Sequence, residues 1–183
     1  MFSIKTAFAI VGVAAATMTF STNAMAQTAI EIRGGANVPT FDIADAAKIG
    51  PSFGVGISKK ATDRLWVIGD FDYGMHANKT SGGPDINVSH YIAKLGWELN
   101  KGADSKWTVV LNAGAGAMNF SVDGGSSFTY PAINVGAKLI YGFSERTSFV
   151  LSPQGDIAFS KKDELGTNNA WVWPFAAGLR FNF

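Results

Sequence analysis

The sequence of 183 residues contains no cysteine, and this absence excludes several kinds of structure and chemistry. It rules out disulfide bonds, a thiolate nucleophile and a thiolate-bound zinc ion. Charged residues are also scarce, at 16% of the chain, where a typical soluble domain has about 25%. A chain without disulfides and with so few charges must be stabilised by its own core or by a solvent other than water.

Only the N-terminus carries a long uninterrupted apolar run. Lys5 precedes an apolar stretch from Thr6 to Phe20, and Ala24-Met25-Ala26 places small residues before a cleavage site. This pattern predicts a secretory signal peptide over residues 1–26 and a mature domain over 27–183. Of the 15 basic residues one is Lys5, so the mature domain has 14 against 14 acidic ones. Balanced charge gives no indication of a nucleic-acid partner.

Sustained helical periodicity is missing from residues 27–183, whereas alternation with a period of two recurs eight times. Each alternating segment is about ten residues long. This pattern predicts an all-β fold, an eight-stranded antiparallel up-and-down transmembrane β-barrel preceded by the signal peptide. The segments span residues 29–38, 51–59, 66–76, 90–99, 107–117, 132–143, 148–159 and 171–183.

The connections between these segments alternate in length. Short polar connections follow the second, fourth and sixth segments, and longer or glycine-rich ones follow the odd-numbered segments. Bacterial outer-membrane barrels have this asymmetry, with short periplasmic turns and longer extracellular loops. The sequence therefore predicts that both chain ends lie on the periplasmic side.

Alternation alone leaves open which face points inward, because a soluble barrel such as a lipocalin has the same period with an apolar interior. Three features favour an apolar face turned toward lipid. The polar face is built mainly from Gly, Ser, Asn and Ala, which suit a narrow lumen. Aromatic residues gather near segment ends, as at lipid–water interfaces; those expected there are Tyr73, Tyr91, Trp97, Trp107, Tyr141 and Trp171.

The third feature is that charges on the polar face nearly balance, as buried charges must. We expect them to form a lumenal ion-pair network that sets strand register: Glu31, Arg33, Asp70, Asp72, Lys94, Glu98, Lys138, Asp156 and Arg180. A hairpin centred on the connection 77–87 would place Asp70 opposite Lys94 and Trp66 opposite Glu98. Pro153 interrupts a segment and cannot donate to a ladder, so we expect a bulge or a local water there.

At this point the sequence resembles the families of small eight-stranded outer-membrane barrels: OmpA barrel domains, OmpX-like proteins and opacity-type proteins. The resemblance rests on "AMA" at the cleavage site, "IRGGANVPTF", "GPSFGVGISKKATDRLWVIGDFDYG" and "GLRFNF". It implies an integral protein of the Gram-negative outer membrane and cell envelope, of the kind grouped with porin-family barrels. Phe181 and Phe183 resemble the C-terminal signal read by the barrel-assembly machinery.

The resemblance and the residues together predict a monomer with a structural or surface-interaction role, a side-chain-filled lumen and contacts made through its loops. Expected partners are outer-membrane lipid and lipopolysaccharide, the assembly machinery and a host or envelope protein. One alternative is a narrow channel for small solutes, and another is an enzyme that modifies lipid A.

We expect neither catalysis nor a cofactor. Asp70, Asp72 and His76 share a face and could be imagined as a metal site, but ion pairing explains the two carboxylates better. Ser89 and His90 are adjacent on a strand, so their side chains point to opposite faces and cannot form a catalytic pair.

Overall fold

The computed structural model describes residues 28–100 and 106–183, most of which lie in strands. Alternating apolar and polar residues favour extended backbone, because each face of a strand then meets a single kind of environment. In chain order the elements are β1 (Thr28–Thr40), α2 (Ile43–Ala46), β2 (Gly50–Lys60), β3 (Leu65–His76), β4 (Ile86–Glu98), β5 (Trp107–Val122), β6 (Ser127–Gly142), β7 (Thr147–Ala158), α3 (Lys162–Leu165) and β8 (Ala170–Asn182).

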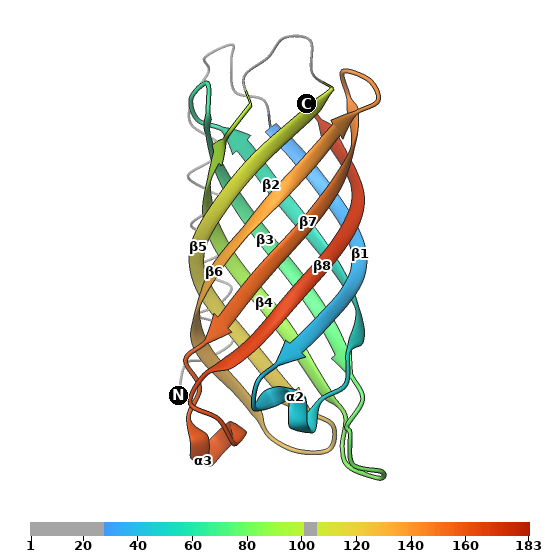
Figure 1. Cartoon of the computed structure of the whole chain (residues 1–183), viewed down its shortest axis with the longest axis vertical. Helices are drawn as coiled ribbons and strands as arrows, with labels where there is room; N and C mark the ends of the chain where they lie inside the picture. The colour runs from blue at the N-terminus through green and yellow to red at the C-terminus, as the bar shows by residue number, and fades with distance from the viewer. Residues whose placement is uncertain (1–27, 101–105) are drawn as a thin grey trace.

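The eight strands form one closed antiparallel barrel in which neighbours in sequence are neighbours in space (Figure 1). The barrel closes between β1 and β8, whose register runs from Ala29↔Asn182 to Thr40↔Trp171. Closure gives every strand two hydrogen-bonded neighbours and leaves no open sheet edge. The predicted eight-stranded up-and-down barrel is confirmed. The predicted signal peptide over residues 1–26 lies outside the described residues.

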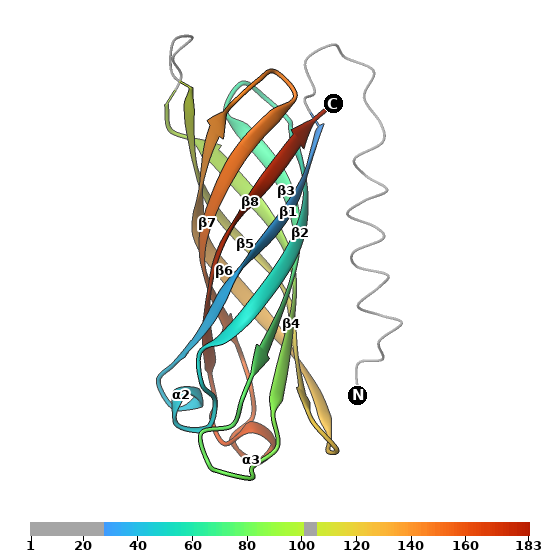
Figure 2. The ribbon, with the colours of Figure 1, turned by 90° about the vertical axis from the view of Figure 1, so that its right-hand side faces the viewer.

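The two ends of the barrel differ. Tight connections from β2 to β3 and from β6 to β7 lie at one end, here called the short-turn end, which is uppermost in Figure 1. The opposite, long-loop end carries α2, α3 and the connections from β3 to β4 and from β5 to β6 (Figures 1 and 2). Neither helix was expected, because one turn of four residues is too short to produce a helical period.

The register of β3 and β4 differs from the prediction by two residues, so the expected pairing of Asp70 with Lys94 is wrong. A shift of two keeps each side chain on its own face, and the expected partners still meet along a diagonal. Lys94 Nζ lies 2.9 Å from Asp70 Oδ2, and Trp66 Nε1 donates to Glu98 Oε2 at 3.1 Å. The ladder pairs are Asp70↔Ile92 and Trp66↔Gly96.

At Pro153 the sequence predicts a bulge or a local water, and the bulge is wrong. The β6–β7 ladder reaches Gly136↔Gln154 and resumes at Leu139↔Leu151 in the same register, so no extra residue is inserted. Proline has no N–H to donate here. Instead the Gln154 side chain turns to the neighbouring strand, where Nε2 donates to the carbonyl of Ala137 at 2.8 Å. A side-chain amide thus supplies a hydrogen bond to the backbone beside the proline.

Candidate functional site

The structure decides which face of the strands points inward. The nine charged side chains of the predicted network lie buried inside the barrel, as with Asp70, which is 6% exposed, and Arg180, which is 2% exposed. The outward positions of the strands carry large apolar side chains, and Ile32 and Leu95 are each 59% exposed. This distribution is the reverse of that in a water-soluble barrel with an apolar interior. The outward apolar side chains of the eight strands form what we call the outer belt.

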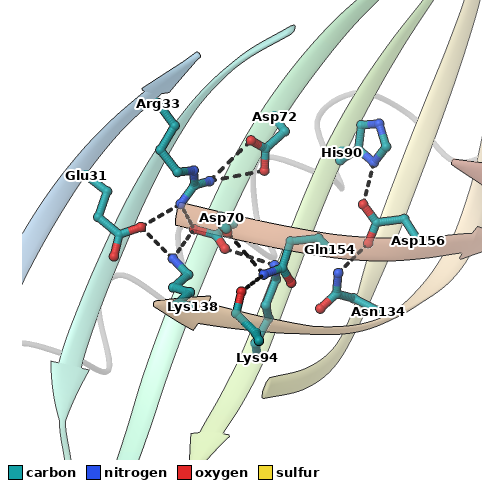
Figure 3. A network of polar contacts seen from close by, with 12 residues as sticks. Glu31, Arg33, Asp70, Asp72, His90, Lys94, Asn134, Lys138, Gln154 and Asp156 are labelled. Atoms are coloured by element: carbon teal, nitrogen blue, oxygen red, sulfur yellow. Dashed lines mark hydrogen bonds and ion pairs between the residues drawn. The ribbon is translucent and has the colours of Figure 1, made fainter. Parts of the chain in front are cut away.

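Seven of the nine predicted network residues meet inside the barrel. We call this set the central network, and Figure 3 shows most of it. Its members are Glu31, Arg33, Asp70, Asp72, Lys94, Lys138 and Arg180.

Arg33 of β1 joins three carboxylates. Its Nη1 donates to Glu31 Oε2 at 2.6 Å and to Asp70 Oδ1 at 2.8 Å, while Nη2 donates to Asp72 Oδ2 at 3.1 Å. The planar guanidinium suits this task because its donors are fixed in a fork. Through Arg33, β1 is tied to β3 across the lumenal face of β2.

Lys138 of β6 reaches two of these carboxylates, those of Glu31 and Asp70, from another part of the wall. Its Nζ lies 2.5 Å from Glu31 Oε2 and 3.2 Å from Asp70 Oδ1, and Arg180 Nη1 donates to Glu31 Oε1 at 2.9 Å. Asp70 therefore contacts three cations, since Lys94 is also within ion-pair distance. Fully desolvated charges are tolerated only when they are paired and hydrogen-bonded in this way.

Two glycines of β2 leave the space that the central network occupies. A Cβ atom at Gly56 would lie 2.4 Å from Asp70 Oδ1 and 2.8 Å from Arg33 Nη1, and one at Gly54 would lie 2.0 Å from Asp72 Oδ1. β2 lies between β1 and β3 and pairs with both. Side chains at these two positions of β2 would therefore lie between the charged groups of β1 and those of β3. The absence of side chains lets those groups meet.

The remaining two predicted network residues lie apart from the central network. Asp156 Oδ2 lies 2.7 Å from His90 Nδ1, and its Oδ1 accepts from Asn134 Nδ2 at 2.6 Å (Figure 3). Asn37 Nδ2 lies 3.2 Å from His90 Nε2. Sequence reasoning missed His90 as a partner, although its even position on β4 places it on the same face as Lys94.

Glu98 lies near the short-turn end. Its Oε2 accepts from Trp66 Nε1 at 3.1 Å and lies 2.7 Å from Lys60 Nζ. The guanidinium of Arg180 lies over the Trp66 ring, 4.7 Å from the ring centroid, which is within cation–π range. Trp66 thus connects this ion pair to the central network.

Apolar clusters lie above and below these polar groups. Toward the short-turn end are Trp66, Ile68, Val110, Ile140 and Val150. Toward the long-loop end is a larger group, here called the mouth cluster: Ile43, Ala47, Ile86, Val88, Ile92, Met118, Phe120, Tyr130, Ala132, Ala158, Ala170 and Val172. The lumen therefore holds packed apolar side chains toward both ends as well as the central network.

The six aromatic residues expected at interfaces all lie on the outer surface, five of them toward one end or the other. Trp97, Trp107 and Tyr141 lie toward the short-turn end, and Trp107 and Tyr141 have ring centroids 4.9 Å apart. Tyr73 and Trp171 lie toward the long-loop end, whereas Tyr91, the sixth of the 13 residues of β4, lies near the middle of the wall. Phe181 and Phe183 are also outward, at the short-turn end of β8 and just beyond it.

The connections at the long-loop end are tied to one another. The Lys48 N–H donates to the Ala77 carbonyl at 2.9 Å, and Thr167 Oγ1 donates to Asp42 Oδ2 at 3.1 Å. These bonds link the β1–β2 connection to those between β3 and β4 and between β7 and β8. Three of the connections at this end are therefore joined by hydrogen bonds.

A smaller polar group lies beside α3. Lys161 Nζ donates to Glu164 Oε1 at 3.1 Å, and the Tyr130 hydroxyl donates to Glu164 Oε2 at 2.9 Å. The hydrogen bonds from Lys161 and from Tyr130 lower the pKa of the Glu164 carboxyl group, because both stabilise its charged form.

The structure separates the residues that a catalytic or metal site would need. Ser89 points outward and His90 inward. His76 Nδ1 lies 2.8 Å from the Lys48 carbonyl oxygen, away from the Asp70 and Asp72 carboxylates that bind Arg33. Among residues 28–100 and 106–183, no three His, Asp or Glu side chains are grouped to hold a metal ion.

No helix in the described part of the chain is long and apolar enough to cross a membrane.

Comparisons with known proteins support the architecture. No protein-family model matches the sequence, and a search of curated proteins finds no match. Among solved structures, Neisserial surface protein A superposes with a TM-score of 0.65 and 16% identity, covering 87% of this chain and 98% of that one. A major outer membrane protein from Thermus thermophilus gives a TM-score of 0.62, 13% identity, and coverage of 86% of this chain and 99% of that one.

A third structure, the outer membrane protein OprG from Pseudomonas aeruginosa, gives a TM-score of 0.58 and 13% identity, covering 86% of this chain and 95% of that one. At these identities the likeness concerns the fold. The chain has the fold of the small eight-stranded barrels of bacterial outer membranes.

Proposed function

We propose that this chain is an integral outer-membrane protein whose barrel crosses the membrane and whose role is structural and surface-interacting. The observation that carries the proposal is the inverted distribution of side chains, with an apolar outer belt around a charged interior. Exposure of such a belt to water is unfavourable by about 25 cal/mol for each Å². Hydrocarbon around the belt removes that cost, and the paired charges inside remain shielded from lipid.

The dimensions of the strands fit this environment. They are between 11 and 16 residues long, and about 9–11 residues of a tilted strand cross a bilayer. Aromatic side chains lie on the outer surface toward both ends, where interfacial Trp and Tyr are found in membrane barrels. We assign the short-turn end to the periplasm and the long-loop end to the cell surface.

Interaction with partners would then occur at the long-loop end. This surface is built from α2, α3 and the connections joined by hydrogen bonds, including Thr167 to Asp42. Lipopolysaccharide and a host or envelope protein are the partners we propose for it. The enclosed central network gives the barrel a rigid interior on which these connections are held.

Three measurements test the membrane assignment. A closed barrel should migrate differently on SDS gels before and after boiling, and it should fractionate with the outer membrane. Because the chain lacks cysteine, a single thiol can report on each end. Thr80→Cys at the long-loop end should react with a membrane-impermeant maleimide in intact cells, and Glu145→Cys in a short turn should react only after permeabilisation.

The reverse labelling pattern would show that the two ends are assigned the wrong way round. Recovery in the periplasmic fraction, together with gel mobility that does not change on boiling, would show that the barrel is not a membrane protein.

A narrow channel is the second candidate, and one observation favours it. Several buried polar atoms along the lumen have no hydrogen-bond partner among the described residues: Arg33 Nε, both amide atoms of Asn112, Asn134 Oδ1 and Arg180 Nη2. Such atoms are commonly satisfied by internal water, and linked water would permit conduction. The apolar clusters at both ends oppose a continuous path. A steady current through the protein in planar bilayers would establish the channel.

Assembly provides a further test of the proposed function. Phe181 and Phe183 lie outward on the closing strand and beyond it, and we propose that the barrel-assembly machinery reads them. Phe183→Ala should lower the amount of protein in the outer membrane while leaving refolding in detergent unchanged. An equal loss in both assays would mean that the side chain acts on folding rather than on recognition.

A further inference from the structure

The backbone at the end of β1 reverses the direction of one aromatic side chain. Odd-numbered positions of β1, such as Glu31, Arg33 and Asn37, face the lumen. Continued alternation would point Phe41 into the barrel mouth. Phe41 instead has φ 57°, and its side chain is outside and 68% exposed. Because the backbone of Phe41 lies in the left-handed region of φ/ψ space, its ring points outward instead of into the barrel mouth.

This conformation is unfavourable for phenylalanine, since a bulky side chain in the left-handed region crowds the backbone. It is held by the structure around it. The Phe41 carbonyl accepts from the Ala44 N–H at 2.9 Å at the start of α2, and the next residue, Asp42, accepts from Thr167. Strained backbone that the surroundings maintain is often tied to function.

The exposed ring adjoins the outer belt. Phe41 and Trp171 have ring centroids 5.4 Å apart in an edge-to-face arrangement, and Trp171 is on the outer surface of β8. At the other side of α2, Ile49 is 65% exposed. Both exposed fractions exceed those of the belt residues Ile32 and Leu95, although the segment lies at the rim rather than in the middle of the wall.

The same segment also has an inward side. Between Phe41 and Ile49, Ile43 at the start of α2 and Ala47 just after its end belong to the mouth cluster. The connection is thus fixed inward by two buried side chains, and it presents one large apolar side chain outward at each flank.

We propose that Phe41 and Ile49 anchor the β1–β2 connection in the lipid at the headgroup–acyl boundary, which holds α2 over the barrel mouth. The proposal rests on the membrane insertion proposed above. Lipid is the occupant we commit to because Phe41 adjoins the outer belt through Trp171, and Ile49 continues the outward alternation of Pro51 and Phe53 in β2. Phe and aliphatic side chains suit this position, because the apolar side chains of membrane-surface segments are buried at the boundary between headgroups and acyl chains.

Single-cysteine variants test this directly, because the chain has no native cysteine. Phe41→Cys and Ile49→Cys carry an environment-sensitive nitrobenzoxadiazole fluorophore, and the labelled proteins are reconstituted in phosphatidylcholine vesicles. Asp45→Cys, on the exposed side of α2, is the matched control in the same connection. Val135→Cys, in the outer belt of β6, reports membrane insertion itself.

The expected result is a blue shift at positions 41 and 49, strong quenching by lipids spin-labelled near the headgroup, and loss of quenching by aqueous iodide. The probe at Asp45 should remain open to iodide. Iodide quenching at 41 and 49 equal to that at 45, with Val135 still shielded, would overturn the anchor and leave the membrane assignment intact. An iodide-accessible Val135 would instead contradict the proposed function.

A second copy of the chain is the alternative occupant. A blue shift that disappears when the protein is diluted in lipid would assign the patch to protein–protein contact and overturn the proposal. Gel mobility before boiling shows whether each labelled variant is folded. If Phe41→Cys does not fold, the probe at Ile49 decides the question by the same criteria.

Discussion

Asp70→Asn is the substitution that tests the interior most sharply. Asp70 accepts from Arg33 Nη1 at 2.8 Å and lies 2.9 Å from Lys94 Nζ and 3.2 Å from Lys138 Nζ. Asparagine has nearly the same shape, so the change leaves no cavity. It removes one negative charge from a point where three cations meet and leaves them facing a neutral amide.

The expected loss of stability in Asp70→Asn follows from the charges of the central network, which has three carboxylates and four cations. The substitution leaves two carboxylates for four buried cations. Removing one partner of a buried ion pair typically costs about 3–5 kcal/mol, because the other charge stays buried without compensation. We expect Asp70→Asn to lower the free energy of unfolding by about this amount.

Asp72→Asn is the matched control. Its carboxylate contacts Arg33 alone among the cations of the central network, at 3.1 Å. Loss of hydrogen bonds to one charged group is worth about 1.5–3 kcal/mol, so the control should be less destabilising than Asp70→Asn.

The assay is urea unfolding of each variant refolded in lipid vesicles, followed by tryptophan fluorescence, with free energies obtained from the midpoint and slope. The double variant Asp70→Asn/Lys138→Met removes a cation together with the carboxylate. Contacting residues couple by about 0.5–3 kcal/mol, so the double variant should be more stable than the sum of the single losses predicts. Equal losses for Asp70→Asn and Asp72→Asn, with strict additivity, would refute charge compensation around Asp70.

Three further predictions concern other parts of the molecule. Gly56→Ala should destabilise the barrel by about 1–3 kcal/mol in the same urea assay, because the added methyl group overpacks against the central network. Gly69→Ala is the control on the outer face. Its Cβ would lie 3.5 Å from the nearest neighbouring atom, so this substitution should have little effect. Gln154→Leu removes the side-chain donor to a backbone carbonyl of β6 and should lower the free energy of unfolding by about 1–3 kcal/mol. An unchanged urea midpoint would count against a stabilising role for this hydrogen bond. The pKa of Glu164 in the folded protein lies below its ordinary value, which is that of the unfolded chain. The stability that its hydrogen bonds add is therefore fully present when the pH is above the ordinary pKa. It is lost as the pH falls through the lowered, folded-state pKa. Tyr130→Phe should raise this pKa in an NMR titration, and an unshifted titration would exclude the hydroxyl as a cause.

Much of the fold could be predicted because the direction of a strand side chain depends only on its position in the local sequence. The even positions of β3, for example, put Asp70 and Asp72 on one face whatever the partner strand. Register could not be predicted in the same way. The β3–β4 hairpin differs from the expected pairing by two residues, since alternation with a period of two is equally satisfied by either register.

In the candidate site, too, the direction of the side chains could be predicted from the sequence, whereas their partners could not. Composition indicated that the inward charges nearly balance, but the partner of Asp156 is His90 and not a basic side chain of the predicted set. The role of Gln154 beside Pro153 was also missed, because it depends on a carbonyl of another strand. Phe41 departs from the alternation of β1 through a single backbone angle, and no residue pattern around it signals that change.

The sequence by itself determined the number of strands, their antiparallel order and the two chemical faces of the wall, because each depends on local alternation and on the lengths of the connections. Only the tertiary structure decided which charges meet, which glycines leave room for them and which connections are hydrogen-bonded to one another. Those contacts join side chains from strands that are far apart in the chain, such as Lys138 and Glu31. They depend on how the closed sheet staggers its strands around the lumen, and no local pattern encodes that stagger.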